Sequence, residues 1–208
     1  MAEMKHKKRG SMTLLLILLV ALIGATVALF MWPTEEAKPK AEPATENNEA
    51  EQRSAEDDVE ATTLIHAGDT APDFTVQMLD GRRVALAEND GKPTLLIFWA
   101  TWCPPCREEL AHLQEGIIDV YGDKLRVLPI SRGEKREVVE EFINTMGYTF
   151  AVGLDSDQVA YNKYASNYIP RCFVIDAKGG VVYAGVGYDE TVAGEVKAAI
   201  EKTLEAAE

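Results

Sequence analysis

A C-x-x-C motif between an apolar run and an amphipathic segment is the feature that most constrains this chain. Residues 94–100 are apolar enough to form a buried strand, and residues 107–113 fit a helix. Cys103 would therefore lie at the start of that helix, with Cys106 one turn further on. Unpaired backbone N–H groups and the helix dipole favour a thiolate there, and the thiolate is the form that attacks disulfides. The motif predicts a redox-active dithiol.

Charge and cysteine count exclude several other classes of protein. The formal net charge of −13 argues against nucleic-acid binding, which needs clustered Lys and Arg. The three cysteines, Cys103, Cys106 and Cys172, are too few for a disulfide-stapled scaffold. The histidines are scattered and supply no second ligand pair for zinc. We therefore expect neither a metal nor another cofactor.

The beginning of the chain predicts a membrane anchor. Residues 1–11 carry a basic cluster, and residues 12–32 are uncharged. About 20 apolar residues in a helix match a hydrocarbon core of about 30 Å. Because positive residues stay in the cytoplasm, everything after the anchor should lie on the extracytoplasmic, periplasmic side of the cell membrane. A cleaved signal peptide is the alternative, but the apolar stretch is long for one.

The next segment separates the anchor from a single globular domain. Residues 33–65 are rich in Glu, Ala, Pro and Lys and nearly devoid of large apolar side chains. Such a segment cannot bury enough surface to offset its ordering entropy, so it predicts a disordered tether. Residues 66–208 then form the folded domain.

Within that domain, short apolar segments alternate with amphipathic ones. Strands are expected at 71–76, 83–86, 94–100, 126–130, 172–175 and 181–184, and helices at 103–120, 138–146, 155–164 and 191–206. Asp80-Gly81 between the first two strands is a hairpin signal, and Asp176 begins a turn between the last two. The pattern predicts an α/β fold: a mixed sheet with helices on both faces and an N-terminal hairpin.

Several of these segments resemble the thioredoxin superfamily and, more narrowly, its membrane-anchored TlpA/ResA-type thiol-disulfide oxidoreductases. The similar segments are residues 98–106, Ile169-Pro170 and residues 173–176, together with Ala71-Pro72-Asp73-Phe74, the hairpin and a central insert before Pro170. The resemblance implies a thioredoxin-like fold in which Pro170 is cis and faces the C-x-x-C motif. It also implies that the backbone of Ile169 pairs with the substrate peptide, on a surface that includes Trp102, Pro104 and Pro105.

Three positions need separate treatment. Thioredoxin has a buried acid six residues before its first cysteine, where this chain has Ile97. The ResA branch carries a glutamate three residues after the second cysteine, and Glu109 occupies that position. Glu109 is either a proton shuttle or a solvated helix carboxylate. Cys172 is either a small buried apolar residue or a third thiol that pairs with Cys103 on over-oxidation.

The expected chemistry is dithiol–disulfide exchange in which Cys103 attacks and Cys106 resolves. Pro104 and Pro105 remove two N–H donors that could have stabilised the thiolate, which favours a reductant. Arg107 acts in the opposite direction, because its positive charge favours the thiolate. A reductant in an oxidising compartment needs electrons, so we expect a transmembrane thiol donor as partner. The substrate would be a protein disulfide, and the resemblance suggests apocytochrome c before haem attachment.

Two alternatives belong to other classes. A peroxiredoxin-like peroxidase would share the entry at 71–74, but it needs Thr or Ser three residues before a lone reactive cysteine, where this chain has Ala100. A metallochaperone could hold copper(I) between the two cysteines.

Overall fold

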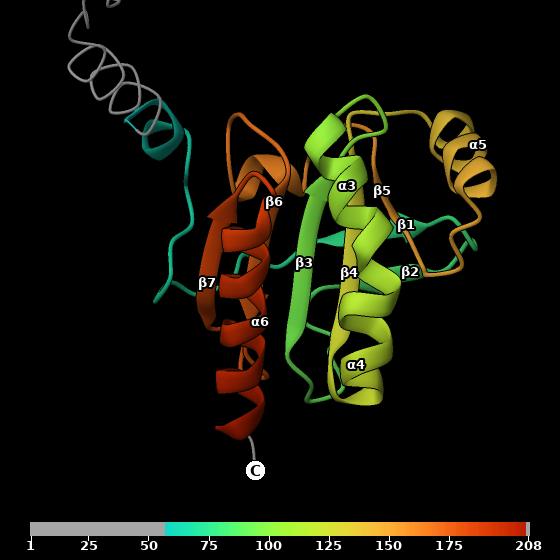
Figure 1. Ribbon diagram of the computed structural model, residues 1–208. Coiled ribbons are helices and arrows are strands. Elements are labelled where there is room, and N and C mark those ends of the chain that lie inside the picture. The colour runs from blue at the N-terminus through green and yellow to red at the C-terminus, as the bar shows by residue number, and fades with distance from the viewer. Residues whose placement is uncertain (1–56, 207–208) are drawn as a thin grey trace, which may run out of the picture. The chain divides into compact units, whose positions relative to one another are not determined.

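The computed structural model of the protein describes residues 57–206. Within them, seven strands form one mixed sheet in the order β2-β1-β5-β4-β3-β6-β7 (Figure 1). The strands are β1 (Thr75–Met78), β2 (Arg83–Ala85), β3 (Thr94–Trp99), β4 (Arg126–Arg132), β5 (Gly153–Asp155), β6 (Arg171–Ile175) and β7 (Val181–Val186). The α-helices are α3 (Pro104–Leu113), α4 (Asp119–Tyr121), α5 (Arg136–Met146) and α6 (Glu190–Glu205). A π-helical turn, η1 (Gln114–Ile118), joins α3 to α4.

The strand before the C-x-x-C motif lies at the centre of the sheet. Every residue of β3 is buried, which agrees with the apolar run that predicted it. It pairs in parallel with β4 and antiparallel with β6, and Ile97 lies opposite Cys172. The end of β3, the start of α3 and the start of β6 therefore meet at one edge of the sheet, where ligands bind in many open α/β folds.

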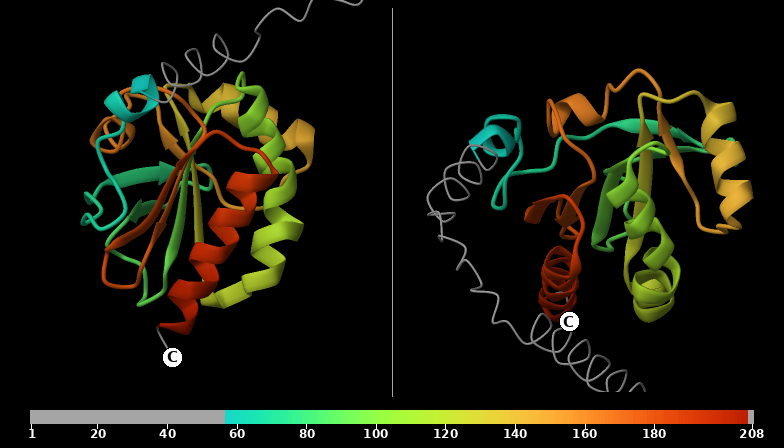
Figure 2. Two further views of the ribbon diagram at one scale, coloured as in Figure 1. Left: turned by 60° about the vertical axis from the view of Figure 1, so that its left-hand side comes forward. Right: turned by 45° about the horizontal axis from the view of Figure 1, so that its top comes forward.

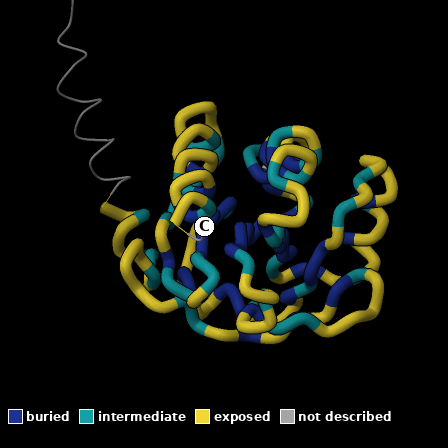
Figure 3. Tube along the Cα trace, turned by 90° about the horizontal axis from the view of Figure 1, so that it is seen from below, coloured by how far each residue is buried: buried dark blue, intermediate teal, exposed yellow. Residues whose placement is uncertain are grey.

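Alternate residues of β3 face two separate cores. Leu95, Ile97 and Trp99 pack with side chains of α3, α5 and α6. These three helices lie on one side of the sheet (Figure 3). The opposite core contains Leu96 and Phe98, with Phe74, Tyr161 and Tyr164 against them. The prediction of helices on both faces was wrong in this respect: aromatic residues from irregular segments and a 3-10 turn cover the second face.

The helix predicted at 155–164 is also absent. Only one 3-10 turn forms there, η3 (Tyr161–Lys163). The Asp155 carboxylate accepts hydrogen bonds from the backbone N–H groups of Ala160 and Tyr161, at 3.0 and 2.7 Å. The acid was expected to cap a helix, but its carboxylate closes a loop instead.

Both predicted hairpins are confirmed. β1 pairs antiparallel with β2, and Gly81 has the positive φ of 88° that its turn needs. β6 pairs antiparallel with β7, and the Asp176 carboxylate accepts from the N–H groups of Lys178 and Gly180 in the connecting turn. The two hairpins form opposite edges of the sheet (Figure 2).

Most of the N-terminal predictions lie outside the described residues. These are the cytoplasmic segment 1–11, the anchor 12–32 and the first part of the tether. No helix within residues 57–206 is both long and apolar enough to cross a bilayer. Residues 57–65, which we expected to belong to the disordered tether, are ordered: 57–61 are helical, and Thr63 forms a β-bridge with Ala165.

Candidate active site

Cys103 and Cys106 lie where α3 begins. Cys103 is the N-cap residue, and its Sγ is joined to Cys106 Sγ in a disulfide with a Cα–Cα distance of 5.3 Å. The backbone N–H of Cys106 donates to Cys103 Sγ over 3.3 Å. Pro104 and Pro105 occupy the first two helical positions and have no N–H. Cys106 therefore supplies the single backbone donor of the first helical turn that reaches this sulfur.

Cys103 is less accessible than expected in this oxidised state. The residue is 3% exposed, and Cys106 is fully buried. The order of exposure agrees with the prediction, but the degree does not, because the segment before β6 approaches the sulfur. The Ile169 carbonyl oxygen lies 3.6 Å from Cys103 Sγ. Trp102, by contrast, is 66% exposed.

The segment that approaches Cys103 contains the expected cis proline. The Ile169–Pro170 peptide bond is cis, and β6 starts immediately after it. Tyr168 precedes the pair with a φ of 65°, in the left-handed region. The Tyr161 hydroxyl donates to the Tyr168 carbonyl oxygen over 2.7 Å and supports this loop from the protein interior. The structure thus brings Cys103, Ile169 and Pro170 together.

Glu109 is a buried carboxyl group one turn after Cys106. Burial raises its pKa from 4.5 to about 7, and a hydrogen bond from Cys172 opposes that rise. The alternative of a solvated helix carboxylate is therefore wrong for Glu109. Its Oε1 accepts from Cys172 Sγ over 2.7 Å, whereas Oε2 has no hydrogen-bond partner within the described residues.

Cys172 is fully buried in the apolar core, as one of the two interpretations expected, and its thiol also donates a hydrogen bond to Glu109. Desolvation, reinforced by Glu109, raises the pKa of its thiol well above the ordinary value. A neutral thiol is a poor nucleophile, and the group is a free thiol here. Its pairing with Cys103 on over-oxidation stays a prediction.

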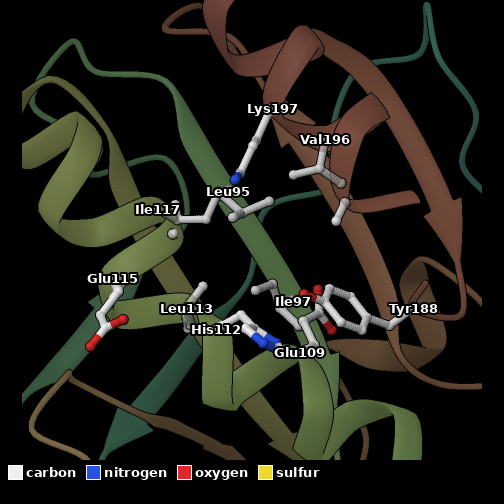
Figure 4. Close-up of a pocket in the computed structure, with 12 residues that line it drawn as sticks. Leu95, Ile97, Glu109, His112, Leu113, Glu115, Ile117, Tyr188, Val196 and Lys197 are labelled. Atoms are coloured by element: carbon white, nitrogen blue, oxygen red, sulfur yellow. The ribbon is translucent and has the colours of Figure 1, made fainter. Parts of the chain in front are cut away.

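A largely apolar cavity of about 300 Å³ opens beside Glu109, between α3 and α6. Figure 4 shows Glu109, His112 and Tyr188 gathered at one end of it and Lys197 at the other. The His112 and Tyr188 rings stack, with centroids 6.1 Å apart. The cavity gives the buried carboxyl group a route toward solvent.

Sequence reasoning missed Glu134, which holds the loop in front of Cys103. Its carboxylate accepts from the Thr101 backbone N–H at 2.9 Å, from the Thr101 hydroxyl and from the Ser131 hydroxyl at 2.8 Å. The contact spans 33 residues of sequence. No local pattern around Glu134 could have indicated it.

The described residues contain no group of three or more His, Cys, Asp or Glu side chains placed to hold a metal. Two histidines have other partners there. His66 Nε2 lies 3.1 Å from Glu60 Oε1, and His112 Nδ1 lies 3.0 Å from the Glu108 carbonyl oxygen. Neither histidine joins the cysteines in a shared site.

Comparison with known proteins yields one consistent family. Residues 67–184 match the AhpC/TSA family. The thiol-disulfide oxidoreductase ResA of Geobacillus thermodenitrificans is 35% identical over 120 residues, which is 57% of this chain and 68% of the relative.

Solved structures show the same relationship. A thioredoxin-family thiol:disulfide interchange protein from Chlorobium tepidum superimposes with a TM-score of 0.56 at 27% identity, covering 67% of this chain and 97% of the other. StoA from Bacillus subtilis superimposes with a TM-score of 0.54 at 27% identity, covering 62% and 96%. The fold is therefore thioredoxin-like, as the sequence resemblance implied.

Proposed function

Because this chain belongs to the AhpC/TSA family and is a thiol-disulfide oxidoreductase of the ResA type, we propose that it reduces protein disulfides through Cys103 and Cys106. One observation carries the proposal: the cysteine pair lies at the N-terminus of α3, with the Ile169 carbonyl oxygen 3.6 Å from Cys103 Sγ. A substrate strand that pairs with the backbone of Ile169 would bring its own sulfur to Cys103.

The reaction proceeds in two exchanges. In the reduced enzyme, the Cys103 thiolate attacks one sulfur of the substrate disulfide, and the other substrate sulfur leaves as a thiolate. Cys106 then attacks Cys103 Sγ, which breaks the mixed disulfide and releases the second substrate thiolate. Two electrons pass to the substrate, and the enzyme is left with the Cys103–Cys106 disulfide.

The burial and the raised pKa of Glu109 support a role in the second exchange. Cys106 is buried, so its thiol has no direct contact with water when it must lose a proton. A carboxyl group with a pKa of about 7, one turn along the same helix, can take that proton near neutral pH. The adjoining cavity then gives the proton a path to solvent.

The helix start supports reduction as the working direction. A thiolate that accepts one backbone N–H in place of two is less stabilised, and its disulfide is then a weaker oxidant. The partner of such an enzyme would be a transmembrane thiol carrier that returns two electrons to Cys103 and Cys106. Apocytochrome c, with its cysteines reduced before haem attachment, is the proposed substrate on family grounds.

We place the domain outside the cytoplasm on a membrane tether. The support is the sequence: a basic segment at 1–11, an uncharged stretch at 12–32 and a polar, Pro-containing segment from 33 onward. The folded residues after this segment would then face the periplasmic side. A reductase there requires the membrane electron donor, so the two proposals support each other.

A trapping experiment tests the function. In the full chain, Cys106→Ala should accumulate mixed disulfides between Cys103 and substrate proteins, because the resolving sulfur is gone. Cys103→Ala should trap none and lose dithiol-dependent reduction. The trapped complexes should sediment with the membrane fraction and remain there after an alkaline wash. Equal trapping by both variants would contradict the assignment of Cys103.

The two alternatives have direct assays. Ala100 lies where a peroxidase needs a hydroxyl residue, and we expect no dithiol-dependent peroxide consumption above that of Cys103→Ala. Copper(I) retained at one equivalent after gel filtration of the reduced protein would instead favour a metallochaperone.

A further inference from the structure

Tyr168 has an unfavourable backbone conformation beside the reactive sulfur. Its φ of 65° lies in the left-handed region, where a bulky residue is a true outlier. The side chain gains no deep burial in return, since the residue is 38% exposed. Strained backbone of this kind persists where the surroundings impose it, and it concentrates at functional sites.

The surroundings that impose it extend from the end of β4. The Tyr161 ring is fully buried, and its hydroxyl donates to the Tyr168 carbonyl oxygen. The Arg132 guanidinium lies 4.0 Å from the centroid of that ring. Arg132 in turn donates twice to Gln158 Oε1, at 3.0 and 2.6 Å. Tyr168 is therefore held in place through Tyr161 from the C-terminal end of β4.

The same end of β4 holds the loop on the other side of the sulfur. Ser131 and Glu134 bind one another, and Glu134 binds the backbone N–H of Thr101. Thr101 directly precedes Trp102, the most exposed large apolar residue within the described part of the chain. The backbone just before Trp102 and the backbone of Tyr168 are thus both held from the end of β4.

Both aromatic residues also neighbour the point of attack. Trp102 is bonded to Cys103, and Tyr168 is bonded to Ile169, whose carbonyl oxygen is 3.6 Å from Cys103 Sγ. A substrate sulfur must reach Cys103, so the residues beside the substrate cysteine come near Trp102 and Tyr168. Rigid, partly exposed Trp and Tyr side chains favour apolar contacts at low entropic cost.

We propose that Trp102 and Tyr168 are specificity-determining residues that select an extended protein segment with an aromatic or aliphatic side chain next to its disulfide-bonded cysteine. The inference rests on the proposed reductase function and names the class of substrate segment. Glycine at position 168 would relieve the backbone strain. It would also remove one of the two aromatic side chains that contact the substrate segment, which explains why a tyrosine is found there.

The test uses the reduced full chain and two synthetic disulfide peptides. They differ only in the residues that flank the cysteine, which are Phe and Leu in one peptide and Ser and Asn in the other. Both peptides are uncharged, because the chain's net charge of −13 would otherwise influence binding. We expect wild-type kcat/KM to be about tenfold higher for the apolar peptide, from two aromatic contacts. Tyr168→Ala, Tyr168→Gly and Trp102→Ala should each reduce that ratio at least threefold, mainly through KM.

Matched variants separate recognition from a general loss of folding. Tyr168→Phe keeps the ring and should keep the preference. Val120→Ala removes an exposed apolar side chain next to Tyr121 of α4, at the opposite end of α3–α4 from Cys103, and should leave the ratio unchanged (Figure 1). Tyr168→Gly should also unfold at a higher denaturant concentration than Tyr168→Ala, because glycine adopts the positive φ freely.

The outcomes distinguish this inference from the function on which it rests. A wild-type enzyme that reduces both peptides equally, or a Tyr168→Gly variant that keeps the full preference, overturns the inference alone. A wild-type enzyme that reduces neither the peptides nor oxidised glutathione overturns the proposed reductase function. A lower ratio in the three truncated variants, with Tyr168→Phe and Val120→Ala unchanged, supports the inference.

Discussion

At the residue scale, Glu109 combines a buried position with an ionisable group. The fold tolerates it because the carboxyl group is easily protonated there, and Cys172 provides a hydrogen bond. The unfolded chain would ionise the same group near pH 4.5. Between that value and about 7, the folded protein therefore holds a proton that the unfolded chain has lost.

This difference predicts how stability depends on pH. Since the native pKa is raised, the contribution of Glu109 to stability is complete below pH 4.5 and is lost as the pH rises to about 7. A shift of this size corresponds to about 3 kcal/mol. Glu109→Gln should abolish that loss, so wild type should lose about 3 kcal/mol relative to the variant between pH 4.5 and 8. Urea unfolding of the oxidised proteins measures it.

Glu108→Gln is the matched control, because Glu108 is next to Glu109 in sequence but is exposed. It should keep the pH dependence of wild type. The rate of disulfide exchange should likewise lose its dependence on pH around 7 in Glu109→Gln and keep it in Glu108→Gln. A pH profile of Glu109→Gln that matches wild type in both measurements would contradict the role of this carboxyl group.

At the element scale, the first turn of α3 sets the environment of Cys103 Sγ, the proposed nucleophile. An N-cap side chain accepts from the second or third helical N–H. Here the third position is Cys106, which donates, and the second is Pro105, which cannot. Two helical positions could donate an N–H to Cys103 Sγ, but only one of them does.

Restoring the missing N–H donor should lower the pKa of Cys103 and raise the reduction potential of the cysteine pair. Pro105→Ala adds an N–H at the second helical position, where it can reach Cys103 Sγ. A hydrogen bond to a charged acceptor contributes about 1.5 kcal/mol or more, so the pKa of Cys103 should fall by about one unit. The reduction potential should rise, by at most about 30 mV.

The pKa is measured from thiolate absorbance against pH, and the reduction potential from equilibration with glutathione. Pro104→Ala provides the control, because the N–H at the first helical position does not reach an N-cap side chain. It should leave the pKa of Cys103 nearly unchanged. Equal shifts in the two variants would mean that helix stiffness, and not the donor, controls the thiolate.

At the scale of the whole domain, Arg171 joins the segment at 62–63 to the loop that precedes β6. The guanidinium is buried and donates to the hydroxyls of Thr62 and Thr63, at 2.9 and 2.6 Å. It also donates twice to the Asn167 carbonyl oxygen. Arg171 directly follows Pro170, so the segment at 62–63 supports the loop that approaches Cys103.

Arg171→Met should therefore affect both stability and activity. It keeps the volume of the side-chain stem but leaves the two threonine hydroxyls and the Asn167 carbonyl without their donor. We expect a loss of about 2 to 3 kcal/mol in the free energy of unfolding, with slower disulfide exchange. Arg82→Met is the comparison, since the exposed Arg82 pairs only with Asp80 among the described residues. That variant should change stability by less than about 0.5 kcal/mol.

Much of the fold and the core of the site could be predicted from sequence, for local reasons. The buried strand before Cys103, the two hairpins, α5 and α6 each follow from apolar periodicity and turn residues within one short segment. The helix predicted at 155–164 was wrong, because the Asp residues that suggested a helix cap have another role. The carboxylate of Asp155 instead closes a loop that packs Tyr161 and Tyr164 against the sheet.

By itself, the sequence determined that Cys103 and Cys106 lie at a strand-to-helix junction and that prolines remove the donors between them. Backbone geometry near the motif is a local property, so neighbouring residues suffice to predict it. Only the tertiary structure decided that Glu109 is buried against Cys172, that Glu134 holds Thr101 and that Tyr168 has a left-handed backbone. Burial and long-range hydrogen bonds depend on which distant segments meet, and no local pattern contains that information.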